Sequence, residues 1–202
     1  MVRLYSLDEA SFDTLTPEAL YWIGFLLADG CVSDAGYLTL ALAKKDEGHV
    51  ALFRAFLKAE IPVKHVLASK KYPTAHFRVG SKLLVNSLRK VGITPRKSKT
   101  AYAVPSVAAS RDFWRGVFDG DGYVGTDTCK RLRLELTCNS QLGEQFLEFL
   151  RVEGVQTKAT VRPHKGHFRV VLLSTPAKAT HAVLYAGSTL HLDRKAQYGL
   201  GC

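Results

Sequence analysis

The sequence has few cysteines and no long apolar run. Its four cysteines, Cys31, Cys129, Cys138 and Cys202, are scattered through 202 residues and form no C-x-x-C pair. We therefore expect free thiols in a reducing compartment rather than disulfides or a zinc site. No segment approaches the roughly 18 consecutive apolar residues of a membrane helix. The first residues, MVRLYSLDEASFD, carry acids where a signal peptide has its apolar core. These absences predict a cytoplasmic or organellar protein that is not secreted.

Several catalytic motifs are also missing. There is no glycine-rich phosphate loop, so ATP use is not expected. No serine lies in a nucleophile-elbow context, and no His-Asn-His arrangement is present. The pair His164-x-x-His167 is explained better by a hairpin turn than by metal binding.

Acidic residues are scarce relative to basic ones. Lys and Arg number 28 against 18 Asp and Glu, which gives a net charge of +10. Residues 44–99 alone hold fourteen Lys or Arg and three acids. Such an excess indicates a polyanionic partner, most often nucleic acid. A membrane surface fits less well, because the basic segments alternate like strands and do not form amphipathic helices.

The chain contains an internal repeat. WIGFLLADG at 22–30 recurs as WRGVFDGDG at 114–122, and HFRV at 76–79 recurs at 167–170. An Arg-Lys pair at 96–97 recurs at 194–195. Three landmarks in one order at similar spacing indicate two copies of one unit. We expect the copies over residues 1–103 and 111–202, joined by a linker at 104–110.

Each copy is expected to follow the order αββαββα. Thr16-Pro17-Glu18 and Ser110-Arg111-Asp112 have the composition of helix starts. Each motif helix then ends at Asp-Gly, where Gly30 and Gly122 are expected to adopt a left-handed conformation. Strand pairs, a helix, a basic hairpin and a last helix follow in both copies, and in one strand the residues Leu132, Leu134 and Leu136 alternate toward a core. The pattern predicts an α+β fold with a four-stranded antiparallel sheet in each copy. The remaining elements are expected at 37–42, 131–137, about 47–59 and 141–152, 63–79 and 155–172, and about 80–91 and 176–186.

The two motif helices are expected to pack on each other. Gly24 and Ala28 lie one turn apart, as do Gly116 and Gly120, so each helix has a stripe of small residues. A mid-helix glycine costs about 1 kcal/mol relative to alanine and usually has a packing reason. Close packing along these stripes would bring the C-terminal ends of both helices together.

The paired motifs resemble the LAGLIDADG homing endonuclease family in its single-chain form with two motifs. The likeness extends over nearly the whole chain. The first motif departs from the family pattern at Leu27, where the second keeps Asp119. The resemblance implies a monomer that acts as a pseudo-dimer on double-stranded DNA.

At the eighth motif position the resemblance implies metal-binding acids, Asp29 and Asp121. Two carboxylates at such an interface repel each other, and a divalent cation relieves that repulsion. Mg²⁺ prefers one or two carboxylates with phosphate oxygens and water. We expect Mg²⁺, with Mn²⁺ as a substitute, and further coordination by the backbone carbonyls of Ala28 and Gly120.

The family also has a late basic residue in each repeat, which orders water or stabilises the transition state. Lys97 and Lys195 match it, and Arg96 and Arg194 are their nearest competitors. A second family position follows the second strand: Lys44 and Lys45 in the first copy, and Thr137, Cys138 or Asn139 in the second. Because the copies differ there, the two DNA strands are expected to be cut with unequal ease.

One face of each sheet is expected to lie in a major groove, where Arg can bind guanine and Glu can accept from cytosine. The outward residues of the first copy are Tyr37, Thr39, Lys64, Lys70, His76 and Arg78. Those of the second copy are Arg131, Arg133, Glu135, Lys158, Thr160, Arg162, His167 and Arg169. Lys71, His164 and Lys165 at the hairpin tips, together with Lys70, are expected to contact phosphate.

The differences between the two faces predict a long asymmetric target. The resemblance implies a site-specific endonuclease that cuts this target across the minor groove, leaves short 3′ overhangs and promotes intron homing. Two alternatives on the same fold are an RNA maturase and a DNA-binding regulator without cleavage. Retention of both acids and both late lysines favours the nuclease.

Overall fold

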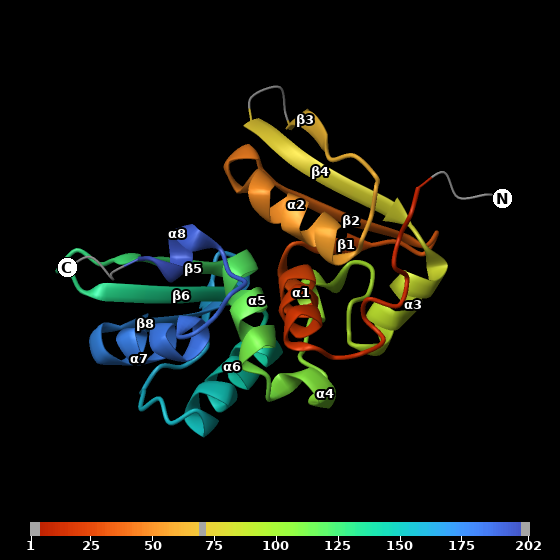
Figure 1. Cartoon of the computed structure of the whole chain (residues 1–202). Helices are drawn as coiled ribbons and strands as arrows, with labels where there is room; N and C mark the ends of the chain where they lie inside the picture. Colours follow the sequence, from red (N-terminus) through yellow and green to blue (C-terminus); the bar gives the residue numbers. More distant parts are fainter. Residues whose placement is uncertain (1–4, 69–71, 199–202) are drawn as a thin grey trace.

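The chain builds the same order of helices and strands twice (Figure 1). The computed structural model describes residues 5–68 and 72–198. The first copy contains α1 (Pro17–Ala28), β1 (Gly30–Val32), β2 (Tyr37–Ala43), the 3₁₀ turn η1 (Lys44–Asp46), α2 (Glu47–Phe56), β3 (Lys64–Ala68), β4 (Tyr72–Gly80), α3 (Lys82–Lys90) and the 3₁₀ turn η2 (Lys97–Lys99). The second contains α5 (Arg111–Asp121), β5 (Gly122–Thr126), β6 (Leu132–Cys138), α6 (Ser140–Val152), β7 (Arg162–His164), β8 (His167–Leu173), α7 (Ser174–Tyr185) and α8 (Asp193–Ala196). The predicted order and the α+β class are confirmed.

Two four-stranded antiparallel sheets have the same topology. Their strand orders are β1-β2-β4-β3 and β5-β6-β8-β7. Helices α2 and α3 cover one face of the first sheet, and α6 and α7 cover one face of the second (Figure 1). The opposite face is called the free face of each sheet, because the described side chains of β2 and β6 alternate between buried positions and more exposed positions on that face. Strand β1 follows α1 directly and β5 follows α5, so each motif helix leads into an edge strand.

Helices α1 and α5 pack along each other at the centre of the molecule (Figure 1). A Cβ added to Gly24 would overlap the backbone carbonyl of Phe113, and one added to Gly116 would overlap the carbonyl of Tyr21. The helices therefore meet backbone to backbone, as the small-residue stripes predicted. One hydrophobic core includes buried side chains of both copies, Trp22 and Trp114 among them.

The starts of both motif helices are as predicted, but their ends are not. The side chains of Thr16 and Ser110 accept hydrogen bonds from the amides of Ala19 and Phe113, each at 3.2 Å. Neither Gly30 nor Gly122 has a positive φ, and Gly122 is extended at φ −88° and ψ 156°. The left-handed helix stop was wrong. Glycine is needed because the chain enters a strand tightly, so a Cβ at Gly30 would press on Leu26 and one at Gly122 would press on Phe118.

The segment between the copies is ordered. It contains the short helix α4 (Pro105–Ala108), in which Val107 is buried. The indole of Trp114 donates a 2.7 Å hydrogen bond to the carbonyl of Ala108. Domain limits at 103 and 111 remain a prediction. Within the described residues, no helix has both the length and the apolar character needed to cross a membrane.

Candidate active site and sheet surfaces

Two carboxylates lie at the adjoining ends of the central helices. Asp29 caps the end of α1, and Asp121 is the last residue of α5. A Cβ added to Gly120 would overlap that of Ala28 and would lie 3.4 Å from Oδ2 of Asp29. The carboxylate of Asp29 therefore borders the turn of α5 that bears Asp121. The predicted pairing of these acids is confirmed in geometry, while their role stays a prediction.

The two acids share an unfavourable environment for negative charge. Both reach solvent, but neighbouring protein atoms remove part of their hydration. This desolvation, followed by repulsion from Asp29, raises the pKa of Asp121 to about 6. Desolvation likewise raises the pKa of Asp29 above its ordinary value, against the attraction of Lys195 and Lys97. A divalent cation would remove the repulsion, so the site favours one.

One buried lysine borders each acid. The ammonium of Lys195 is 3% exposed and donates to the carbonyls of Phe118 at 2.8 Å and Asp119 at 2.6 Å. Lys97 is 8% exposed and donates to the carbonyl of Gly30. These lysines are neither solvated nor free, which excludes the interpretation of a simple surface charge. Burial lowers the pKa of Lys195 to about 8, although acids nearby oppose that shift.

The competing arginines differ in their surroundings. Arg194 in α8 makes an ion pair with Asp46 of the first copy, at 3.1 Å to each carboxylate oxygen. Arg96 is exposed and adopts the left-handed conformation at φ 57°. Neither arginine has the burial or the helix-end contacts of the two lysines. Lys97 and Lys195 therefore remain the better candidates for the late basic residue of each copy.

Sequence analysis missed a buried polar network beside the acids. Asp119 is fully buried in α5, and its carboxylate accepts hydrogen bonds from the hydroxyls of Tyr21 at 2.8 Å and Tyr185 at 2.7 Å. The backbone amide of Leu192 donates a third bond at 2.8 Å. Tyr21 also contacts Nε2 of His49 at 2.8 Å. The hydroxyl of Tyr21 therefore links the buried carboxylate to the imidazole of His49. The acid at a motif position where the first copy has Leu27 was the one signal in the sequence.

The donors present suit a hard cation. The described residues contain no group of three or more His, Cys, Asp or Glu side chains able to hold a metal ion. The oxygens available at the helix ends are the carboxylates of Asp29 and Asp121 and the predicted backbone carbonyls of Ala28 and Gly120. Mg²⁺ typically takes one or two carboxylates and completes its shell with phosphate oxygens and water. The residues therefore fit Mg²⁺ together with a phosphate-bearing substrate.

The free face of the first sheet carries most of the predicted polar residues. Thr39 lies opposite Arg78, and His76 lies between Ala41 and Lys64 in the strand register. The guanidinium of Arg78 lies 4.2 Å from the ring centre of Tyr37. Lys44 and Lys45 are exposed in η1, directly after β2. The predictions for Lys70 and Lys71 lie outside the described residues.

The positive charge on the free face of the second sheet is partly neutralised by an acid. Thr137 lies opposite Arg169, which lies opposite Arg162, and His167 shares their face. Glu135 forms ion pairs with Arg133 and, at 3.5 Å, with Arg169. Its carboxylate is thus engaged with two arginines of its own sheet. At the hairpin tip, His164 pairs with His167 across a turn formed by Lys165 and Gly166, as predicted.

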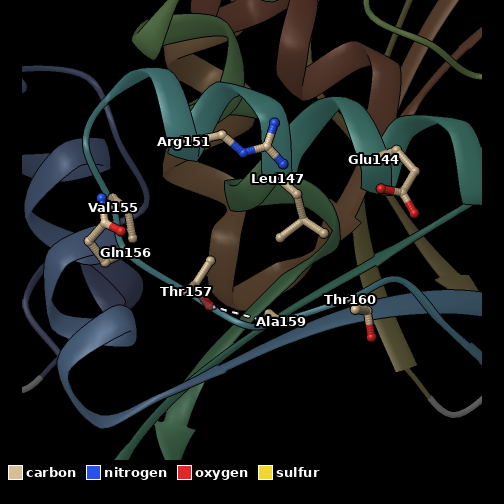
Figure 2. A pocket seen from close by; sticks show the side chains of 8 residues that line it. All are labelled: Glu144, Leu147, Arg151, Val155, Gln156, Thr157, Ala159 and Thr160. Carbon is tan, nitrogen blue, oxygen red and sulfur yellow. Dashed lines mark hydrogen bonds between the residues drawn. The ribbon is translucent and has the colours of Figure 1, made fainter.

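Three predicted strand residues of the second copy lie elsewhere. Arg131 precedes β6 and pairs with Asp127 in the β5–β6 turn, where its Nε donates at 2.8 Å. Lys158 and Thr160 precede β7, and their neighbours Ala159 and Val161 pack against the core. Thr160 lines a pocket with Glu144 and Leu147 of α6 (Figure 2). The predicted strand placement of these three was wrong.

The three residues named for the end of the second strand, Thr137, Cys138 and Asn139, have different surroundings. The side chain of Asn139 caps α6 by accepting from the amide of Leu142 at 2.9 Å, and it donates to the carbonyl of Ala101 at 2.7 Å. Both ends of its amide therefore take part in holding α6 and the segment at Ala101, and its expected contact with DNA stays a prediction. Cys138 points into the core, and burial raises the pKa of its thiol to about 12. Thr137 is the one of the three on the free face.

Comparison with known proteins identifies the fold. No protein-family model matches the chain, and no curated protein matches it in sequence. Among solved structures, the homing endonuclease I-WcaI bound to its DNA recognition sequence is 10% identical over 91% of this chain and 87% of that one, with a TM-score of 0.64. The LAGLIDADG meganuclease I-CpaMI bound to uncleaved DNA is 11% identical over 92% and 89%, with a TM-score of 0.59. The LAGLIDADG homing endonuclease I-SmaMI bound to cleaved DNA is 11% identical over 92% and 87%, also with a TM-score of 0.59. At such identities the likeness establishes a shared fold.

Proposed function

We propose that this chain, which has the fold of the single-chain LAGLIDADG homing endonucleases, is a site-specific double-strand DNA endonuclease. The observation that carries the proposal is the juxtaposition of Asp29 and Asp121, each beside a buried lysine, where the two motif helices meet. Two similar half-sites at one interface suit the cleavage of two similar bonds, one in each strand of a duplex.

The shared fold supports double-stranded DNA as the proposed substrate. The three structural neighbours named above are bound to DNA according to their descriptions. In this chain the two free sheet faces carry arginine, histidine and threonine, side chains that hydrogen-bond to base edges and phosphates. The net charge of +10 favours a polyanion as well. Because the two faces differ in nearly every residue, the target is a long sequence without a palindrome.

The geometry supports the following roles in catalysis. Asp29 and Asp121 would hold Mg²⁺ with the carbonyls of Ala28 and Gly120. When bound, the cation supplies activation of a water molecule and neutralisation of charge on the phosphate. Lys195 and Lys97 lie at fixed positions beside the acids, where an ammonium can orient water or stabilise negative charge that develops in the transition state. Desolvation strengthens these interactions relative to water.

The products and the biological setting complete the proposal. Cleavage across the minor groove would leave short 3′ overhangs, and a cut in an uninterrupted copy of a gene would promote intron homing. A reducing compartment, cytoplasmic or organellar, suits the free thiols of the described Cys31, Cys129 and Cys138.

The test begins with selection of a target. The purified chain is incubated with a library of randomised DNA duplexes in Mg²⁺, and both bound and cut molecules are sequenced. We expect one asymmetric target that wild type cuts in both strands, and that Asp29→Asn and Asp121→Asn bind but do not cut. Cleavage at the wild-type rate by either variant would contradict the assignment of the acids. Binding without cleavage by wild type would indicate the regulator, and a preference for structured intron RNA over every duplex would indicate the maturase.

A further inference from the structure

We propose that Asp119 is a positioning residue that fixes Lys195 and thereby controls the cleavage of one DNA strand. The inference rests on the proposed function, because it assigns the residue a part in that reaction. Asp119 itself is fully buried and has no surface to offer a substrate. Its effect must therefore pass through the groups that it contacts.

The path from Asp119 to Lys195 is short and consists of hydrogen bonds. Oδ2 of Asp119 accepts from the amide of Leu192, the residue that precedes α8. The carbonyl of Leu192 in turn accepts from the amides of Lys195 at 2.8 Å and Ala196 at 3.1 Å. The carboxylate thus fixes the start of the short helix that bears Lys195. That helix then directs the ammonium of Lys195 back to the carbonyls of Phe118 and Asp119.

The carboxylate is itself held from three other elements. Tyr21 reaches it from α1 and Tyr185 from α7, and His49 of α2 lies within hydrogen-bond distance of the Tyr21 hydroxyl. All three partners are buried. A carboxylate with three donors in a dry environment has little freedom to rotate, since each donor left without its acceptor would cost about 1–3 kcal/mol. Asp119 therefore transmits the position of the helix pair to α8.

The first copy has no equivalent of this device. Leu27 occupies the motif position of Asp119, and Phe113 occupies that of Tyr21. Lys97 lies in η2, whose backbone is fixed by amides of Thr100 and Ala101 that donate to its carbonyl at 2.8 Å and 2.7 Å. None of these contacts involves Asp119. Loss of Asp119 should displace Lys195 and leave Lys97 in place.

This asymmetry gives the inference a distinctive signature. If each lysine serves the phosphate nearer to it, a change at Asp119 slows one strand and spares the other. A merely structural role would reduce the amount of folded protein and slow both strands together. The ratio of the two strand rates separates these cases.

The experiment uses the selected duplex with each strand labelled separately, under single-turnover conditions in Mg²⁺. The variants are Asp119→Asn, which keeps the shape and one acceptor oxygen, and Asp119→Leu, which copies Leu27. Lys195→Met identifies the strand that Lys195 serves. A matched control is Leu147→Ala, a core truncation in α6 of the same copy. Duplex affinity and melting temperature are measured for every variant.

We expect Asp119→Leu to slow the strand that Lys195→Met slows by about tenfold to a hundredfold, as misplaced catalytic groups do. Asp119→Asn should retain part of that rate, and the other strand should stay near its wild-type rate, so that nicked duplex accumulates. In the Lys195→Met background, Asp119→Asn should add little, because both changes act through one group. Leu147→Ala should leave the strand ratio unchanged.

Several results would overturn the inference. Equal slowing of both strands by Asp119→Asn would do so, as would an unchanged strand ratio or full additivity with Lys195→Met. If Asp119→Leu does not fold, Asp119→Asn and the double variant still decide the question. Failure of wild type to cut either strand of any duplex would remove the proposed function and this inference with it, and is thereby distinguished from failure of the inference alone.

Discussion

Arg194 and Asp46 join the two copies through a two-point ion pair. The Nε and one terminal nitrogen of Arg194 lie 3.1 Å from the two carboxylate oxygens of Asp46, which is 148 residues away in the sequence. Asp46 follows Lys44 and Lys45 in η1, and Arg194 precedes Lys195 in α8. The pair therefore spans the region between a sheet of the first copy and the helix of the second copy that bears the candidate lysine.

Asp46→Asn should weaken this link and lower the free energy of unfolding by about 1 kcal/mol, near the upper end for partly exposed pairs. Urea denaturation measures the change. The matched control is Asp34→Asn, which breaks the more exposed pair between Arg89 and Asp34 within one copy. That control should cost less than about 0.5 kcal/mol. Equal costs for both variants would show that the interdomain position of the Arg194 pair adds nothing.

Gly116→Ala should destabilise the chain by about 3 kcal/mol or more. The new methyl group would overlap the carbonyl of Tyr21, and two helix backbones cannot yield as flexible side chains do. Gly48→Ala in α2 is the control, because no atom lies within 4 Å of its added Cβ. It should be neutral or stabilising by up to about 1 kcal/mol. Comparable melting temperatures for the two variants would contradict close packing of α1 and α5.

Asp121→Asn should stabilise the metal-free protein at neutral pH. The pKa of Asp121 is raised to about 6 in the folded chain from an ordinary value of 3.8. Between these values the folded state binds more protons than the unfolded state, so stability falls as pH rises from about 4 to about 6. Asn cannot ionise, so the variant does not lose this stability as the pH rises. Its melting temperature should exceed that of wild type at pH 7 and converge with it below about pH 4.

Asp127→Asn provides a control of opposite sign for that pH dependence. The hydrogen bond from Arg131 lowers the pKa of Asp127, so its contribution is present at neutral pH and is lost as the carboxylate is protonated in acid. This variant should melt below wild type at pH 7 and should also converge with it in acid. A pH profile of Asp121→Asn parallel to that of wild type would contradict the raised pKa.

Mg²⁺ should raise the melting temperature of wild type and have little effect on Asp29→Asn or Asp121→Asn. A ligand that binds only the folded state adds about 2.7 kcal/mol at one hundred times its dissociation constant. Calorimetric scans at increasing MgCl₂, with NaCl at matched ionic strength, measure the response. Asp34→Asn, on the surface of the first copy, should respond as wild type does. An undiminished response in either helix-end variant would place the cation elsewhere.

Much of the fold could be predicted from the sequence because each element expected in one copy is supported by a matching pattern in the other copy. The helix starts at Thr16 and Ser110, the small-residue stripes and the strict alternation around Leu134 each depend on neighbours in sequence or on a period that one sequence displays. The pairing of α1 and α5 followed from glycine positions alone. The ends of elements were harder to predict, and Lys158 and Thr160 show why. Alternation continues through them, but only tertiary packing determines where a ladder forms.

The polar partners of the site could not be predicted in the same way. Asp119 meets Tyr21 from 98 positions away and Tyr185 from 66. No local pattern encodes such a meeting, since it exists only after both helices and α7 have packed. Asn139 shows the reverse case, because a residue with good binding chemistry is also required to cap α6. Polar side chains have several possible uses, and the sequence does not indicate which one the fold selects.

The bond between Tyr21 and Asp119 also limits how freely halves of this kind can be exchanged. A dimer of two first copies would set the buried hydroxyl of Tyr21 against Leu27, which cannot accept its proton. In a symmetric pair each Tyr21 would lose that bond and would keep His49 as a partner, at a cost of about 1 kcal/mol for each lost hydrogen bond. A recombinant with a foreign second half would need an acid at the position of Asp119 to be compatible. The interface between α1 and α5 therefore discriminates between possible partner halves. It is asymmetric in the protein alone, without DNA.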